Sequence, residues 1–506
     1  MNFKKILAIS AACVFAFLTN TALAQEPVQS TTLEVFSQGY NKYVNNPYGY
    51  EAVLPDSLKL NEDIVSVKSR FESENLVVDI LYDNFDDDLN NIDTYLGYAN
   101  RGILNNPAFK ITREYDKDYS GLNGHVVIYE RKKIENGIPD CNYYATVAFA
   151  RSYKESITVF IKSAQPINID YVMPNFKFID KYGTMKQDAV FEPVNKEFDE
   201  KTQAFYNKYL EDSEKASFGI FEPSYPFYSY ELNKLENMFD YEFPVTLIYN
   251  SFQSPYKTDQ MNKAKEDGKV VEYGLYTTDA EDGKEKDITL EIIEGKYDEY
   301  LDNLAQNFKQ YDYPVLFRLN NEMNGEWVSY CAHNVGKDTD LFIRCWRYIY
   351  DRFKEHGVDN VIFVWNPNEK SFPNFAYNHY LNYYPGNEYV DVVGLTAYNT
   401  GDYYDGEVWR SFSEAYDPFY YDYARHFKHP MMITEFSCAS AGGNKSMWFD
   451  DMFTKMPNYD RIKLAVLWNG QDFDTEKPGK VISRNYRLDL EHDITESIKR
   501  GLQKFK

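Results

Sequence analysis

The chain has 506 residues, of which 43% are hydrophobic and 26% charged, so it contains enough apolar material for large cores and is not a disordered chain. Its formal net charge of −24 disfavours nucleic acid and anionic membrane surfaces as partners, because both repel an acidic protein. At about 150 residues per domain, the length predicts two or three domains. Aromatic residues make up 17%, a composition that suits stacking on sugar rings as well as ordinary core packing.

The first 24 residues have the pattern of a secretory signal peptide. Lys4 and Lys5 precede an apolar run over 6–18, and Ala22-Leu23-Ala24 is a small-x-small cleavage site. A transmembrane anchor is the disfavoured alternative, because it would need about 20 apolar residues. We therefore expect a secreted or periplasmic protein whose mature chain starts at Gln25, with no membrane span elsewhere.

Residues 25–165 are predicted to form a small α+β domain built on an antiparallel sheet. Runs of strand-forming residues occur at 67–71, 76–80, 125–129, 144–149 and 157–161, with a helix expected near 91–104. This segment carries no recognisable chemistry, and its role stays open. Residues 166–194 are interrupted by Pro and Gly and are expected to be a linker.

From residue 195 to 503, short strand runs alternate with sequence of helical length. The strand runs are 218–221, 243–249, 270–276, 314–319, 361–365, 390–395, 430–434 and 464–468. The clearest helix places Phe342, Trp346, Ile349 and Phe353 on one apolar face. Eight strands alternating with helices predict an α/β fold, the (β/α)₈ or TIM barrel, in which catalytic residues lie at the carboxyl ends of the strands.

Two of the expected strands end in a glutamate. The strand over 314–319 leads into Glu322, and the strand over 430–434 leads into Glu435. These ends meet at one opening of a barrel, so we expect the two side chains to face each other. Carboxyl groups about 5 to 5.5 Å apart are the geometry of retaining glycoside hydrolysis, one acting as nucleophile and the other as acid and base. Either glutamate alone is more often a solvated loop or helix-terminal residue, so the pair carries the prediction.

Other side chains at the same strand ends are candidate substrate contacts. Arg318 has the strand parity of Glu322 and could partner the ionised glutamate, and Asn321 could hydrogen-bond a sugar hydroxyl. The aromatic candidates are Trp327, Trp365, Tyr398 and Trp468. Their rings could form a sugar platform, and Tyr398 could donate a hydrogen bond to the nucleophile, although core packing is the commoner role of any single ring.

The sequence around these residues resembles family 26 of the glycoside hydrolases, over about residues 195–500. The resemblance starts in the run Arg318-Leu319-Asn320-Asn321-Glu322 with Trp327. It continues through Trp346-Arg347, Asn360-Val361, Trp365-Asn366-Pro367-Asn368, Asp391, Gly394, Tyr398-Asn399, Trp409-Arg410-Ser411-Phe412, Ile433-Thr434-Glu435-Phe436, Lys445 and Trp448.

The resemblance implies a retaining mechanism with Glu322 as acid and base and Glu435 as nucleophile. It also implies that Trp327 and Trp468 line the sugar site, that Tyr398 orients the nucleophile, and that the enzyme is endo-acting. The commonest substrate in the family is β-1,4-mannan, a plant-type polysaccharide, with β-glucan and β-1,3-xylan as minorities. The family usually has His where this chain has Asn321, which bears on mannan preference more than on hydrolysis.

Two other classes of function compete with this interpretation, a metal enzyme and a barrel that only binds carbohydrate. Asp83, Asp86, Asp87, Asp88 and Asp93 form an acidic run, and residues 279–283 approach a calcium loop with the glycine one position early. Solvated turns explain both better, so we expect no metal or other cofactor. A binding protein would need aromatic rings but no carboxyl pair. A monomer is the favoured oligomeric state.

The mature chain would keep four cysteines, Cys141, Cys331, Cys345 and Cys438. Their spacing matches neither a disulfide framework nor a zinc site. Cys331 and Cys345 could pair in an oxidising compartment, and free buried thiols are an equally good alternative.

Overall fold

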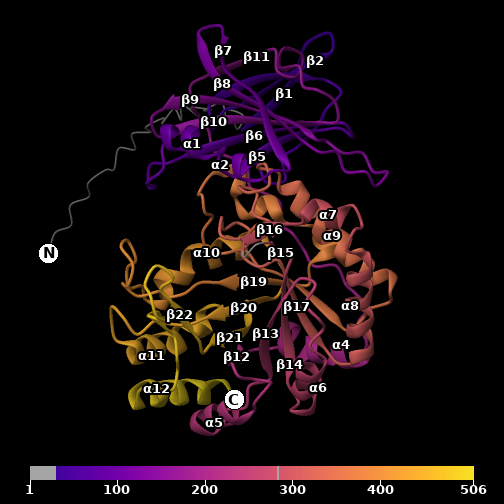
Figure 1. Ribbon diagram of the computed structural model, residues 1–506. Helices are drawn as coiled ribbons and strands as arrows, with labels where there is room; N and C mark the ends of the chain where they lie inside the picture. Colours follow the sequence, from indigo (N-terminus) through magenta and orange to yellow (C-terminus); the bar gives the residue numbers. More distant parts are fainter. Residues whose placement is uncertain (1–29, 282–283) are drawn as a thin grey trace, which may run out of the picture.

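The computed structural model describes residues 30–281 and 284–506. Antiparallel sheets from the first part of the chain lie over one end of a barrel formed by the rest (Figure 1). The expected signal peptide, residues 1–24, lies outside the described residues. Within the described ranges, no helix is both long and apolar enough to cross a membrane.

The first part contains two antiparallel sheets, with strand orders β1-β2-β3-β11 and β4-β5-β6-β10-β9-β8-β7. The strands are β1 (Thr31–Ser37), β2 (Tyr40–Asn45), β3 (Tyr50–Pro55), β4 (Lys59–Asn61), β5 (Lys68–Glu72), β6 (Leu76–Asn84), β7 (Phe109–Tyr119), β8 (Leu122–Arg131), β9 (Tyr143–Ser152), β10 (Glu155–Ser163) and β11 (Asn175–Phe178). Helices α1 (Ile92–Tyr98), α2 (Arg101–Asn105) and α3 (Ile169–Val172) connect some of them. The predicted antiparallel architecture is confirmed, and β11 extends it past residue 165 by pairing with β3.

The seven-stranded sheet is buried on both faces. Val126 and Ile161 pack toward the four-stranded sheet, whereas their chain neighbours Val127 and Phe160 pack toward the barrel. Successive residues of a strand point to opposite faces, so each face has its own apolar set. The set that faces the barrel belongs to the same hydrophobic core as the barrel helices.

The second part is a closed barrel of parallel strands, which confirms the predicted (β/α)₈ fold. The barrel strands are β12 (Ser217–Phe221), β13 (Val245–Ser251), β14 (Val270–Tyr276), β17 (Val315–Leu319), β18 (Val361–Trp365), β19 (Val392–Thr396), β20 (Met431–Phe436) and β21 (Ile462–Trp468). Two hairpins project from it, β15 (Thr278–Glu281) with β16 (Lys284–Asp287), and β22 (Gln471–Phe473) with β23 (Ile482–Asn485).

Helices surround the barrel. They are α4 (Glu200–Tyr206), α5 (Tyr230–Phe239), α6 (Thr258–Glu266), α7 (Thr289–Ile293), α8 (Asp298–Tyr311), α9 (Thr339–Glu355), α10 (Phe412–His426), α11 (Lys445–Lys455) and α12 (His492–Leu502). The predicted apolar face of α9 is buried. Between β18 and β19 the chain instead forms short 3₁₀ turns at Ala376–Asn378, Tyr380–Tyr383 and Asn387–Tyr389.

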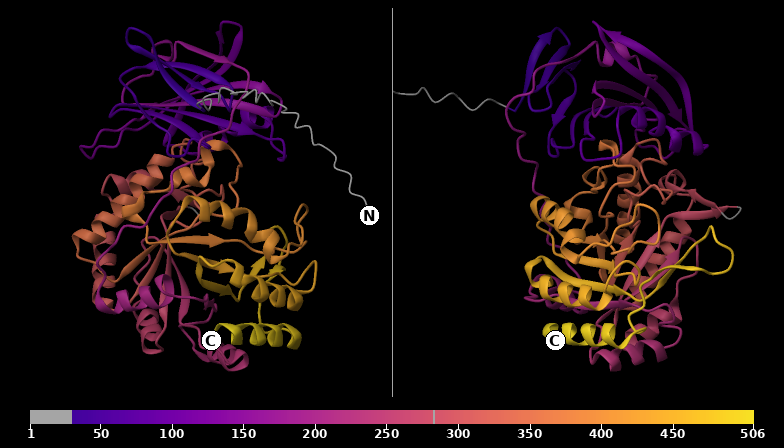
Figure 2. Two further views of the ribbon diagram at one scale, coloured as in Figure 1. Left: turned by 180° about the vertical axis from the view of Figure 1, so that it is seen from behind. Right: turned by 90° about the vertical axis from the view of Figure 1, so that its left-hand side faces the viewer.

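The sheets lie over the loops at one end of the barrel (Figure 2), and close side-chain contacts fix them there. Lys162 Nζ lies 2.8 Å from Asp338 Oδ1, and the Tyr144 hydroxyl donates to Asp338 Oδ2 at 3.0 Å. Asp338 is also the N-cap of α9. Gly102 lies so close to the barrel that a Cβ there would be 1.7 Å from the carbonyl oxygen of His333. The N-terminal sheets are therefore seated directly on the loops that follow β17.

Candidate active site

The two predicted glutamates line one pocket of about 650 Å³ at the carboxyl end of the barrel strands. Glu435 lies within β20, one residue before its end. Glu322 follows β17 in a tight turn, where its backbone adopts a left-handed φ of 54° and its N–H donates to the carbonyl oxygen of Asn366 at 2.7 Å. Such a backbone is costly for a residue with a side chain and persists only where the surroundings hold it. The turn brings two carboxyl groups from distant strands into one cavity.

Glu435 is held by a buried cation and a phenol. Arg318 Nη1 lies 2.7 Å from its Oε2, and the Tyr249 hydroxyl donates to the same oxygen. Arg318 is fully buried and is fixed in turn by Asn366 Oδ1, 2.7 Å from its Nε. Burial and the charge of Glu435 raise the pKa of Tyr249 well above its usual range, so its phenol stays a proton donor. These donors stabilise a negative charge on Glu435.

Glu322 has a different environment. Its oxygens accept hydrogen bonds from Asn368 Nδ2 at 2.8 Å and from Trp327 Nε1 at 3.3 Å. Burial, followed by the charge of Glu435, raises the pKa of Glu322, while Arg318 and the two hydrogen bonds oppose this shift. The two carboxyl groups of the pocket therefore have different surroundings, since Glu435 is bonded to a cation and a phenol whereas burial raises the pKa of Glu322.

Aromatic side chains form the walls of the pocket. Trp468 stacks on Phe221 with ring centroids 5.3 Å apart, and Tyr398 meets the Trp468 ring edge-on at 6.1 Å. Trp327 lies at the rim, 49% exposed, and contacts Phe372 at 5.4 Å. Three of the four aromatic candidates thus border the same space as the glutamates. Flat, accessible rings of this kind can receive the apolar face of a sugar.

Trp365, the fourth aromatic candidate, does not reach the pocket. It is fully buried and packs against Tyr384 and Phe427 at 5.3 and 5.4 Å. Its neighbours Ile362 and Val364 belong to the cluster inside the barrel, so strand alternation directs Trp365 outward toward the helices. The prediction that it contacts substrate is corrected accordingly.

Asn321 is also absent from the pocket lining. Left-handed backbones at Asn320 and Glu322 turn the chain around it, and its carbonyl oxygen accepts the Tyr330 hydroxyl at 2.7 Å. The amide that reaches Glu322 belongs instead to Asn368, on the loop after β18.

The hydroxyl that donates to Glu435 comes from Tyr249 rather than from the predicted Tyr398. Tyr398 lines the same pocket as Glu435, and burial, followed by the charge of Glu435, raises the pKa of its phenol. Sequence reasoning missed Tyr249, although it lies near the carboxyl end of β13, where barrel chemistry is expected.

A second missed residue is Glu272 of β14, which is fully buried with Oε1 3.7 Å from Arg318. Neither of its carboxyl oxygens has a hydrogen-bond partner. Burial raises the pKa of Glu272 well above its usual range, and the nearby charge of Arg318 opposes this shift.

Ion pairs border the remaining pocket wall. Arg410 Nη1 lies 2.6 Å from Glu369 Oε2, and Arg484 Nε lies 2.8 Å from Glu407 Oε1. Within the described ranges no group of three or more His, Cys, Asp or Glu side chains could hold a metal ion. The calcium-like segment lies in the β15–β16 hairpin, and its residues 282–283 are outside the described part.

The four cysteines expected in the mature chain are all free thiols, Cys141, Cys331, Cys345 and Cys438. The pairing of Cys331 with Cys345 is therefore not formed. Burial raises the pKa of the Cys331 thiol to about 12, which makes it unreactive.

Comparison with known proteins identifies relatives of the barrel. Residues 265–441 match the model of glycosyl hydrolase family 26. Endoglucanase H of Acetivibrio thermocellus is 31% identical over 192 residues, which are 37% of this chain and 21% of that protein. Mannan endo-1,4-beta-mannosidase of Bacillus subtilis is 27% identical over 174 residues, 33% of this chain and 42% of that protein. Beta-1,3-xylanase TXYA of a Vibrio species is 28% identical over 208 residues, 37% of this chain and 41% of that protein.

The chain spans less than half the length of each of these relatives. The family model covers Glu322, Glu435 and most of the residues that line their pocket. The barrel therefore contains a segment that is similar to glycosyl hydrolase family 26.

Proposed function

We propose that the protein is a secreted, retaining endo-β-glycanase that hydrolyses β-1,4-mannan, as glucomannan or galactomannan. The observation that carries this proposal is the pair of carboxyl groups in one pocket with opposite surroundings, Glu435 on Arg318 and Glu322 with a raised pKa. Secretion rests on the signal-peptide pattern of residues 1–24.

The proposed reaction is a double displacement. Glu435 attacks the anomeric carbon while Glu322 gives its proton to the departing glycosidic oxygen, leaving a covalent glycosyl-enzyme. Glu322, now ionised, then takes a proton from a water molecule that attacks the same carbon and releases Glu435. Arg318 and the Tyr249 hydroxyl orient Glu435 before attack and stabilise its charge again as it departs.

Mannan is the proposed substrate because it is the commonest in the family and because one relative is a mannan endo-1,4-beta-mannosidase. The names of the other two relatives make β-glucan and β-1,3-xylan the alternative substrates. Asn321 stands where the family usually has His, and this difference could alter the sugar preference. We therefore keep β-glucan and β-1,3-xylan as alternative substrates. The proposed enzyme needs no cofactor and acts as a monomer.

The test is an activity screen of the purified protein on glucomannan, galactomannan, mixed-linkage β-glucan and β-1,3-xylan. Glu322→Gln and Glu435→Gln should each lower kcat by a factor of about 10² to 10⁴, while Glu299→Gln, an exposed glutamate on α8, serves as the matched control. ¹H NMR of the first product should show the β-anomer. A wild-type rate in either pocket variant would remove that residue from the mechanism, and an α-anomer would exclude retention.

Binding without turnover in the parent protein would instead favour a carbohydrate-binding barrel. The same screen also decides the substrate, because a rate on β-glucan or β-1,3-xylan above that on both mannans would replace mannan in the proposal.

A further inference from the structure

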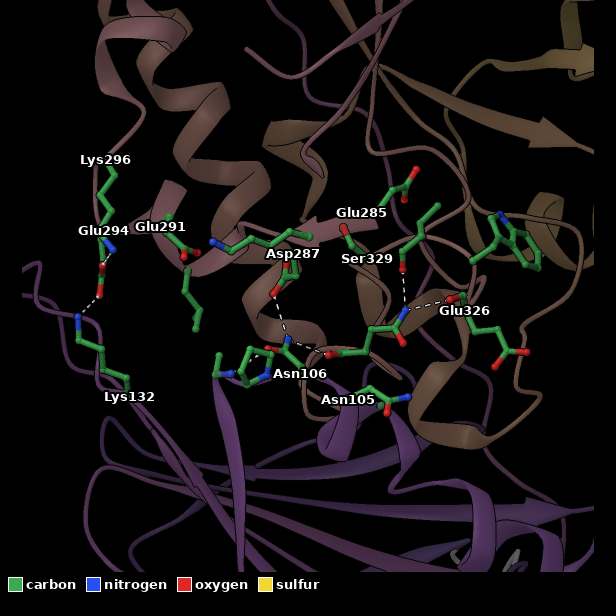
Figure 3. A pocket seen from close by; sticks show the side chains of 18 residues that line it. Asn105, Asn106, Lys132, Glu285, Asp287, Glu291, Glu294, Lys296, Glu326 and Ser329 are labelled. Atoms are coloured by element: carbon green, nitrogen blue, oxygen red, sulfur yellow. Dashed lines mark hydrogen bonds and ion pairs between the residues drawn. The ribbon is translucent and has the colours of Figure 1, made fainter. Parts of the chain in front are cut away.

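A second cavity, of about 1010 Å³, lies between the N-terminal sheets and the barrel (Figure 3). One wall comes from α2, the loop over 106–108 that precedes β7, and Lys132. The other comes from β16, α7 and the loop over 326–334. The cavity is thus formed only where the two parts of the chain meet, and the family model, which begins at residue 265, does not cover its N-terminal wall.

Trp327 joins this interdomain cavity to the pocket of the two glutamates. It lines both spaces, is 49% exposed, and donates its indole N–H to Glu322. A linear ligand that lies between Glu322 and Glu435 can therefore continue over this ring into the interdomain cavity. Because Glu322 is the group proposed to protonate the departing oxygen, the path over Trp327 leads away on the leaving-group side.

The ionisable side chains that line the interdomain cavity include more acids than bases. Its carboxyl groups are Glu285, Asp287, Glu291, Glu294 and Glu326, and its amines are Lys132, Lys286 and Lys296. Lys296 lies 2.7 Å from Glu294, and Lys132 lies 3.6 Å from the same carboxylate, so these two amines are already paired. An anionic ligand would meet a surplus of negative charge. A neutral ligand rich in hydroxyl groups would not.

Side chains that can form hydrogen bonds with sugar hydroxyls line the interdomain cavity. Asn105 is exposed at the cavity. Asn106 is held by the carbonyl oxygen of Asn334 at 3.0 Å and lies 3.5 Å from Asp287. Amides donate and accept hydrogen bonds and carboxylates accept them, so both match sugar hydroxyls, and an accessible indole beside them is suited to a carbohydrate.

The cavity walls are held in place before any ligand arrives. Tyr98 of the N-terminal part stacks on His333 of the barrel with ring centroids 5.0 Å apart, and Gly102 lies against the same loop. Contacts of this kind remove the entropy cost of bringing two walls together around a ligand.

We propose that the interdomain cavity binds the continuation of the same neutral β-glycan chain, on its leaving-group side, and that the N-terminal part thereby supplies sugar subsites to the enzyme. This inference rests on the proposed function, because it assigns the cavity to the substrate of the neighbouring pocket.

The test compares long and short substrates. Asn105→Trp fills the cavity from an exposed position and Glu291→Ala removes a lining carboxylate, while Asn123→Trp alters an exposed asparagine of β8 outside the cavity. The ratio of kcat/KM on a soluble polymer to kcat/KM on the shortest hydrolysed oligosaccharide should fall by about tenfold in the first two variants, the value of a subsite interaction near 1.4 kcal/mol, and stay at the wild-type value in the control.

Affinity electrophoresis in gels containing the same polysaccharides distinguishes the two proposals. If the wild type turns over polymer and the ratio is unchanged in both cavity variants, the subsite proposal is overturned and the proposed function stands. If the wild type turns over nothing, the proposed function fails. In that case the subsite proposal stands only if polysaccharide in the gel slows the migration of the wild type but not that of Asn105→Trp. Equal migration of the two proteins overturns it.

Discussion

Tyr249→Phe is the most direct test of how Glu435 is held. The substitution removes one hydroxyl, which donates to Glu435 Oε2, and keeps the ring, which packs edge-on against Phe221 at 5.4 Å. The ion pair with Arg318 at 2.7 Å remains. The change therefore removes a single charge-assisted hydrogen bond and leaves the shape of the pocket intact.

The expected cost follows from the type of bond removed. A hydrogen bond to a charged group contributes about 1.5 to 3 kcal/mol, which corresponds to a fall in kcat of roughly 10- to 150-fold.

The assay is kcat and kcat/KM on a hydrolysed polysaccharide between pH 4 and 9, with Tyr398→Phe measured in parallel. Tyr398 lines the same pocket as Glu435, yet the hydroxyl bonded to that carboxylate is the one on Tyr249. We therefore expect the larger loss in Tyr249→Phe. A rate within twofold of the wild type for Tyr249→Phe, together with a large loss for Tyr398→Phe, would refute the reasoning.

Three further predictions concern stability. Burial raises the pKa of Glu272 well above its usual range, so the wild type loses stability as pH rises from about 4.3 toward that raised value. Glu272→Gln should therefore gain thermal stability relative to the wild type as pH increases, and calorimetry from pH 4 to 8 measures this gain. Burial also raises the pKa of Asp83 to about 7, and this carboxyl group accepts a hydrogen bond from the backbone N–H of Ala376 at 2.6 Å. The stability that Asp83 contributes is complete below about pH 3.9 and is lost as pH rises to about 7. Asp83→Asn should therefore flatten the pH dependence of Tm over this interval, and an unchanged dependence would contradict the assignment. Lys162→Met should destabilise by about 3 to 5 kcal/mol in denaturant unfolding, because it leaves Asp338 buried without its cation, and a loss below about 1 kcal/mol would show that the pair is not needed.

The sequence predicts the barrel well because each barrel strand is a short run of apolar residues bounded by turns, and this local pattern survives folding. The two glutamates follow from the same pattern, since the strand ends can be located and a barrel brings them together. The sequence also allows the outward direction of Trp365 to be predicted, because Trp365 follows Val364 directly in the strand and adjacent residues point to opposite faces.

Other features depend on contacts that no local pattern records. Tyr249 and Glu435 are 186 residues apart, and their hydrogen bond depends on the diameter and tilt of the closed barrel. The strand β11 lies in a segment broken by prolines, and its pairing with β3 joins residues more than a hundred positions apart. The role of Asn368 depends on the left-handed turn at Glu322, which the residue type does not reveal.

The shared apolar core between the sheets and the barrel means that neither part is a detachable module. A barrel produced without residues 30–178 would expose to water the side chains that now meet Tyr129 and Phe160, and Asp338 would lose both Lys162 and the Tyr144 hydroxyl. Chimeras that exchange the N-terminal part should therefore carry the loop over 326–340 with it, because the two surfaces form one structural unit.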